Sequence, residues 1–219
     1  MTVMVISPHA DDETLGAGGS ILKYKQQGHQ VAWLNVTDMK EEYGYSSARI
    51  SERSAEIELV KKAYAIDIFY NLALEPAALD RYSKSELVQK MAEVFEEVQP
   101  EVVLLPYGYD VHSDHKIVYE TAIACTKVFR CPSVKIILCM EIISETDYAV
   151  SENGFVPNYF IDIDDYMEQK IKIMQYYKSE IKDSPFPRNV DSIRGLALYR
   201  GAAAGARYAE AFRVVKIIE

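Results

Sequence analysis

Short, largely apolar runs alternate with helix-forming segments over residues 3–127. An unbroken apolar run is typical of a strand that is buried on both faces of a sheet. Such strands are predicted at residues 3–6, 30–37, 67–72 and 101–105, and helices at residues 14–27, 47–63, 83–99 and 115–127. Strand and helix repeated in this order predict an α/β fold, with a parallel sheet covered by helices on both faces.

The pattern is weaker in the C-terminal part of the chain. Apolar, β-rich segments are predicted at residues 134–143, 159–163 and 207–219, and helices at residues 164–182 and 191–200. The sequence contains no internal repeat, low-complexity segment or linker. We therefore predict one domain over residues 1–219.

Two clusters of histidine and acidic residues come directly after predicted strands. The first covers residues 9–13 (His-Ala-Asp-Asp-Glu) and the second covers residues 112–115 (His-Ser-Asp-His). Strands joined by right-handed crossovers end at one edge of the sheet, and α/β folds bind their ligands at that edge. We therefore expect the two clusters to meet, although they are far apart in the sequence.

The two clusters carry the chemistry of a metal site. They contain three of the four histidines of the chain, and imidazole and carboxylate are ligands of catalytic zinc. The adjacent acids Asp11 and Asp12 would repel each other in a buried site unless a cation were present. One of them can coordinate the ion while the other accepts a proton from water. Each residue also has a structural interpretation, because an acid pair often caps a helix and a single histidine is often only hydrogen-bonded.

Three other functions are compatible with parts of this pattern. Residues 16–19 (Gly-Ala-Gly-Gly) hint at dinucleotide binding, but Ile21 stands where that fingerprint requires glycine or alanine. A non-catalytic sugar- or nucleotide-binding module would need no metal. A metal-dependent hydrolase of another bond, such as a phosphoester, would favour oxygen ligands and magnesium or manganese, whereas histidine ligands favour zinc or iron(II).

Composition and charge exclude several further classes. The formal charge of -9 disfavours binding to nucleic acid or to an anionic membrane surface. No stretch approaches the roughly 18 apolar residues needed to cross a bilayer, and the N-terminus lacks the features of a signal peptide. The three cysteines are odd in number and show no CxxC spacing, which indicates reduced thiols. We expect a cytoplasmic protein without membrane insertion, and the sequence leaves a homo-oligomer open.

The two clusters and two further motifs resemble those of a known family. The sequence is similar to the PIG-L/LmbE-like N-acetylglucosaminyl deacetylases, which open with His-Pro-Asp-Asp-Glu and carry a second motif, His-Pro-Asp-His. The other matches are an Arg-x-x-Glu helix motif at residues 53–56 and Tyr-Ala-Glu-Ala-Phe at residues 208–212. The resemblance implies a Rossmann-like three-layer sandwich with a mostly parallel sheet. It also implies an amidohydrolase that removes the N-acetyl group of an N-acetylglucosamine-type sugar or conjugate, releasing acetate and a free amine.

The resemblance assigns the metal ligands. It implies that His9, Asp12 and His115 bind Zn²⁺, with Fe²⁺ as the alternative ion. Alanine at position 10 and serine at position 113 replace the prolines of the two motifs, but neither change removes a ligand.

The resemblance also assigns roles around the metal. Asp11 is expected to be the general base, and a protonated His112 to polarise the amide carbonyl or protonate the leaving amine. Asp114 is expected to orient His112, and Arg53 to contact the substrate. The family's Thr-x-Gly-Glu loop reads Thr-Asp-Met-Lys-Glu at residues 37–41, without the glycine. This difference leaves the identity of the N-acetylated sugar open.

Overall fold

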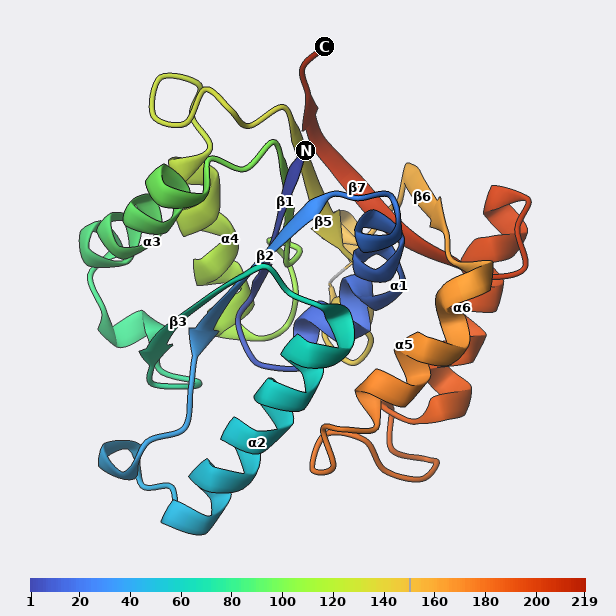
Figure 1. The fold of residues 1–219 in the computed structure, drawn as a ribbon, viewed down its shortest axis with the longest axis horizontal. Coiled ribbons are helices and arrows are strands. Elements are labelled where there is room, and N and C mark those ends of the chain that lie inside the picture. Colours follow the sequence, from blue (N-terminus) through green and yellow to red (C-terminus); the bar gives the residue numbers. More distant parts are fainter. Residues whose placement is uncertain (150) are drawn as a thin grey trace.

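The structure is a computed structural model that describes residues 1–149 and 151–219. Within these residues, the strands form one seven-stranded sheet in the order β3-β2-β1-β4-β5-β7-β6 (Figure 1). Strands β1 to β5 are parallel along the order, and β7 is antiparallel to both of its neighbours. The strands are β1 (Thr2–Ser7), β2 (Gln30–Thr37), β3 (Ile68–Leu74), β4 (Val102–Leu105), β5 (Ile136–Met140), β6 (Tyr159–Asp162) and β7 (Ala209–Ile217).

Helices cover both faces of the sheet and give the predicted three layers. On one face lie α1 (Asp12–Gln26), α2 (Ser47–Tyr64), α5 (Met167–Met174) and α6 (Val190–Ala204). On the other face lie α3 (Lys84–Val98) and α4 (Ser113–Cys125). The α/β fold with a mostly parallel sheet is therefore confirmed.

Strand β1 lies at the centre of the fold because it is apolar on both faces. The side chains of Val3 and Val5 pack into the core beneath α1 and α2, whereas Met4 and Ile6 pack into the core beneath α3 and α4. All four side chains are fully buried. The unbroken apolar run therefore predicted the position of this strand correctly.

Two regions differ from the sequence-based expectation. The predicted helix over residues 164–182 ends at Met174, and the backbone N–H of Lys178 donates instead to the Glu56 side chain. Strand β7, predicted without a direction, runs antiparallel between β5 and β6. Neither feature is encoded locally, because each depends on partners that are distant in the sequence.

Helix α1 packs very closely against its surroundings. A Cβ atom added at Gly16 would lie 2.8 Å from Met140, and one added at Gly19 would lie 2.6 Å from Ile163. Glycine at these positions lets the helix backbone approach the neighbouring side chains. Close packing fixes the N-terminus of α1, from which two side chains of the first cluster project.

The helices in the described part of the chain do not meet the requirements for a membrane span. None of them is both long enough and apolar enough to cross a bilayer.

Candidate metal centre

The two histidine and acid clusters meet at the carboxyl end of the sheet. Strands β1 and β4 are parallel neighbours, with Val3 opposite Val102 and Val5 opposite Leu104. The chain leaves β1 and enters α1 at Asp12, and after β4 it enters α4 at Ser113. Each cluster therefore spans the end of a loop that follows a strand and the first turn of the next helix, and the two lie side by side at one edge of the sheet.

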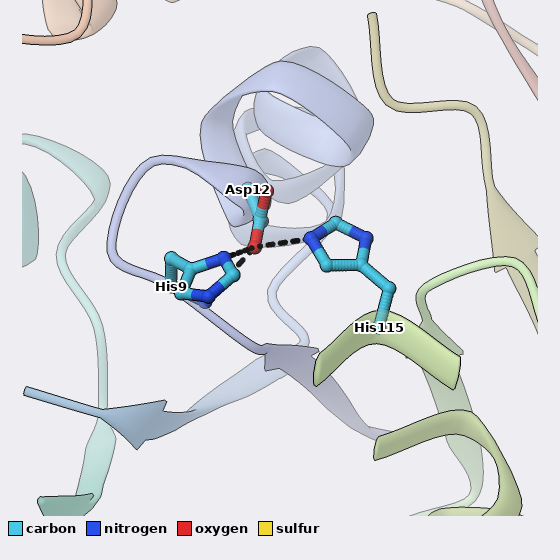
Figure 2. Close-up of side chains that lie close together, drawn as sticks. All are labelled: His9, Asp12 and His115. Atoms are coloured by element: carbon cyan, nitrogen blue, oxygen red, sulfur yellow. Dashed lines mark hydrogen bonds and ion pairs between the residues drawn. The ribbon is translucent and has the colours of Figure 1, made fainter. Parts of the chain in front are cut away.

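The structure brings His9, Asp12 and His115 together around one point (Figure 2). One ligand atom from each residue lies within 4.8 Å of the others. Asp12 Oδ2 is 3.3 Å from His9 Nδ1 and 3.3 Å from His115 Nε2. His115 is fully buried, and among the described residues its Nε2 atom has no hydrogen-bond partner. Two imidazoles and one carboxylate that converge on a point fit a divalent metal ion.

Electrostatics also favour a cation at this point. Burial lowers the pKa of His9, but hydrogen bonds to Asp114 and Asp12 outweigh burial and raise the pKa to about 9. Burial likewise lowers the pKa of His115, but Asp12 and Asp110 raise it to about 10. The carboxylates therefore hold positive charge on both imidazoles, and a bound metal ion would take the place of those protons.

Asp110 contacts the ring nitrogen of His115 that faces away from the metal position. Its Oδ2 atom is 2.8 Å from His115 Nδ1, and both side chains are fully buried. Such a carboxylate keeps a proton on Nδ1 of His115, so that Nε2 would offer its lone pair to a bound metal ion. Asp110 was not among the site residues predicted from the sequence. The only local signal for it is an acid five residues before His115 in the loop between β4 and α4.

Asp110→Ala is expected to weaken metal binding by about 10- to 100-fold, because the His115 ring loses its orienting partner. Asp110→Asn keeps an acceptor without the charge and is expected to lose less affinity. Competition with a chromophoric chelator measures both values. Glu93→Ala, which removes an exposed acid on α3, is the control and should bind metal like the wild type. Unchanged affinity in Asp110→Ala would remove Asp110 from the site.

Asp11 lies beside the metal site with a free carboxylate oxygen. The residue is 3% exposed, and within the described chain its Oδ2 atom has no hydrogen-bond partner. The nearest cation is Arg188, whose Nη1 atom is 3.6 Å from that oxygen. Burial, and after it the negative charge of Asp12, raises the pKa of Asp11 well above its usual value. A buried carboxylate with one oxygen that accepts no hydrogen bond is suited to accept a proton.

His112 and Asp114 are placed differently from the sequence-based expectation. The Asp114 carboxylate contacts His9 Nε2 at 3.0 Å and accepts N–H groups from Ala77 and Leu79, so it does not orient the His112 ring. The backbone N–H of Asp114 donates to His112 Nδ1 at 3.1 Å. Burial, and after it the charge of His9, lowers the pKa of His112 to about 4. The His112 ring is therefore neutral and carries its proton on Nε2.

Arg53 points toward the first cluster but is largely occupied by protein groups. It is 5% exposed, donates to the carbonyl oxygen of Ala10 and forms an ion pair with Glu180. Its Nε atom is 3.2 Å from Glu56 Oε2. Most of the Arg53 guanidinium therefore faces protein groups rather than open space.

A cavity of about 250 Å³ opens over the metal site. Its lining includes acids and arginines, so it offers both acceptors and donors to a polar ligand. The lining residues are His9, Ala10, Asp11, Thr37, Asp38, Met39, Tyr45, Arg53, Pro76, Ala77, His112, Glu145, Glu180 and Arg188.

Comparison with known proteins identifies the family. The sequence profile of PIG-L, described as GlcNAc-PI de-N-acetylase, matches residues 4–126. The chain is also 32% identical over 231 residues to the diacetylchitobiose deacetylase of Thermococcus kodakarensis, covering 97% of this chain and 82% of that protein. The chain belongs to the PIG-L family. The predicted resemblance is confirmed.

Solved structures show the same fold. The conserved protein TT1542 from Thermus thermophilus superposes with a TM-score of 0.81 at 23% identity, covering 99% of this chain and 96% of that chain. N,N'-diacetylchitobiose deacetylase from Pyrococcus horikoshii, in complex with its inhibitor MPG, superposes with a TM-score of 0.76 at 24% identity, covering 98% and 84%. The PIG-L fold is thus shared along nearly the whole chain.

The sequence-predicted residues of this PIG-L protein gather at one place, together with residues that had not been predicted. His9, Asp12 and His115 surround one point, and Asp11, His112 and Arg53 line the cavity beside it. Arg188 and Glu180, on the segment between α5 and α6, complete the cavity wall and were missed. No local pattern marks them, because the segment reaches the site only through the tertiary fold.

Proposed function

We propose that this protein hydrolyses the N-acetyl group of an N-acetylglucosamine-type sugar or conjugate, releasing acetate and a free amine. The observation that carries the proposal is a carboxylate oxygen of Asp11 that accepts no hydrogen bond, next to the convergent atoms of His9, Asp12 and His115. A ligand set for a metal and an adjacent proton acceptor are the two parts that amide hydrolysis requires.

His9, Asp12 and His115 would hold the metal ion. Two imidazoles among three ligands favour Zn²⁺, with Fe²⁺ as the alternative, over magnesium or manganese. When bound, such an ion polarises the acetyl carbonyl and makes water nucleophilic at neutral pH. The other contributions come from side chains of this chain.

Asp11 would move the proton. It accepts a proton from the attacking water and delivers it to the amide nitrogen as the C–N bond breaks, which yields acetate and an amine. His112, neutral with its proton on Nε2, donates a hydrogen bond to the acetyl oxygen as negative charge develops there. Its Nδ1 atom is held by the backbone N–H of Asp114, which fixes the ring for this role.

The cavity supports a carbohydrate substrate. Its volume of about 250 Å³ has room for one sugar ring, so the rest of a conjugate would extend outside. Asp38 and Glu145 can accept hydrogen bonds from ring hydroxyl groups, and Arg188 and Arg53 can donate to ring oxygens. The diacetylchitobiose deacetylase to which the chain is similar is named for an N-acetylated sugar, in agreement with this proposal.

Acetate release from a panel of N-acetylated sugars tests the function. N-acetylglucosamine, diacetylchitobiose and an N-acetylglucosamine–malate conjugate are incubated with purified protein, with and without a chelator. We expect at least one of these sugars to release acetate. The chelator should abolish this release, and added Zn²⁺ or Fe²⁺ should restore it. Elemental analysis of the purified protein identifies the metal. A phosphoester hydrolysed in place of every amide would contradict the proposal, as would acetate release that chelation does not affect.

A further inference from the structure

The backbone at Asp11 adopts a conformation that side chains disfavour. Its φ is 149° and its ψ is −27°, a region that glycine enters far more readily than other residues. A strained residue persists only when its surroundings hold it in place, and such residues cluster at functional sites. The groups that hold Asp11 are therefore candidates for a role in the reaction.

Glu13 holds the amide of Asp11. The N–H of Asp11 donates to Glu13 Oε2 at 3.0 Å, and on the other side of the same peptide group Arg53 donates to the carbonyl oxygen of Ala10. Both ends of the peptide between Ala10 and Asp11 are thus held by side-chain hydrogen bonds. Rotation of this peptide toward a relaxed conformation would break both hydrogen bonds.

Glu13 is itself held by a buried network. Its Oε1 atom accepts hydrogen bonds from Tyr177 Oη at 2.9 Å and from Thr14 Oγ1 at 2.6 Å, and Tyr64 Oη donates to Thr14 Oγ1 at 3.0 Å. Glu13, Thr14 and Tyr177 are fully buried. Glu13 does not line the cavity over the metal site, so it is not placed to contact a substrate.

The strained conformation separates the roles of two adjacent acids. Asp11 is the N-cap residue of α1, where an aspartate usually accepts a hydrogen bond from the first turn; here its side chain forms no cap hydrogen bond. Glu13, the second residue of α1, accepts the N-cap N–H instead, an interaction that the glutamate of a capping box makes from the third position. Asp11 is left with a free oxygen in the cavity, while Asp12 faces His9 and His115.

We propose that Glu13 is a positioning residue for catalysis. It holds the strained turn at Asp11, so that the carboxylate of the proposed general base faces the cavity instead of capping α1. This inference rests on the proposed deacetylase function. A helix cap alone would contribute to stability without affecting turnover at saturating substrate.

Glu13→Ala tests the role. It is expected to lower kcat by about 10²-fold, the usual cost of misplacing a catalytic group by about 1 Å, with KM and bound metal close to wild-type values. Glu13→Gln can still accept from the Asp11 N–H and is expected to recover most of the lost kcat. Met91→Ala, a cavity variant in the core beneath α3, is the control: it should lower thermal stability and leave kcat unchanged.

The crystal structure of the metal-loaded Glu13→Ala variant is a readout independent of activity. Asp11 is expected to relax to negative φ and to turn its carboxylate away from the cavity. If Glu13→Ala does not fold, Tyr177→Phe replaces it in both experiments; it removes one hydrogen bond to Glu13 and is expected to lower kcat several-fold.

Two results would overturn the role of Glu13. One is wild-type kcat in the folded variant, and the other is an Asp11 carboxylate that remains in place in its crystal structure. A wild-type protein that releases no acetate from any sugar would instead overturn the proposed function, and the crystal structure would still decide whether Glu13 positions Asp11.

Discussion

Asp11→Asn is expected to lower kcat by about 10³-fold while the metal stays bound. Asparagine has nearly the same shape as aspartate, and Asp11 is not among the three residues whose atoms converge on the metal position. The substitution therefore removes the proton acceptor and little else. Burial and the charge of Asp12 raise the pKa of Asp11, which makes the wild-type carboxylate a stronger base than a solvated one.

Two control variants separate proton transfer from metal binding. Asp12→Asn replaces a proposed ligand, so metal content and kcat are expected to fall together. Asp38→Asn changes another acid of the cavity wall and is expected to raise KM more than it lowers kcat. Steady-state kinetics and elemental analysis on the same preparations measure these effects. Near-normal turnover in Asp11→Asn would remove Asp11 as the general base.

The approximate position of the site could be predicted from the sequence. The apolar runs before His9 and before His112 identified two parallel strands, and parallel strands end at one edge of a sheet. This rule alone places His9, Asp12 and His115 in one region, and in the structure their ligand atoms lie within 4.8 Å of one another. Strand ends fix position well because hydrogen bonding sets the register between neighbouring strands.

The details of the site could not be predicted, because they depend on loop conformation and on segments distant in the sequence. The Asp114 carboxylate contacts His9 rather than His112, and it also accepts the backbone N–H groups of Ala77 and Leu79, which are distant in the sequence. Glu180 reaches the cavity from residues after α5 that had been predicted as helix, and Arg188 from the segment that follows them. Patterns of hydrophobicity carry no information on such contacts.

The motif at residues 208–212 matches the family, but the sequence assigned it no role. The structure indicates that its glutamate has a structural role. Glu210, on β7, forms an ion pair of 2.6 Å with Lys170 of α5, and the two side chains are 4% and 5% exposed. Glu210 also accepts the backbone N–H groups of Gly19 and Ser20, and Lys170 donates to the carbonyl oxygen of Leu15. The pair thus joins the C-terminal strand and α5 to the middle of α1.

Lys170→Met is expected to lower the free energy of unfolding by about 3–5 kcal/mol, because it leaves the Glu210 carboxylate buried without its cation. Urea unfolding followed by circular dichroism measures the loss. Lys25→Met is the matched control: its partner Asp67 is also 2.6 Å away, but the side chains are 21% and 33% exposed, so a loss of at most about 1 kcal/mol is expected. Equal losses in the two variants would show that the buried Lys170–Glu210 pair contributes no more to the free energy of unfolding than an exposed pair does. A large loss in Lys170→Met alone would mean that α1, which carries Asp11 and Asp12 at its N-terminus, depends on the last strand of the chain for its stability.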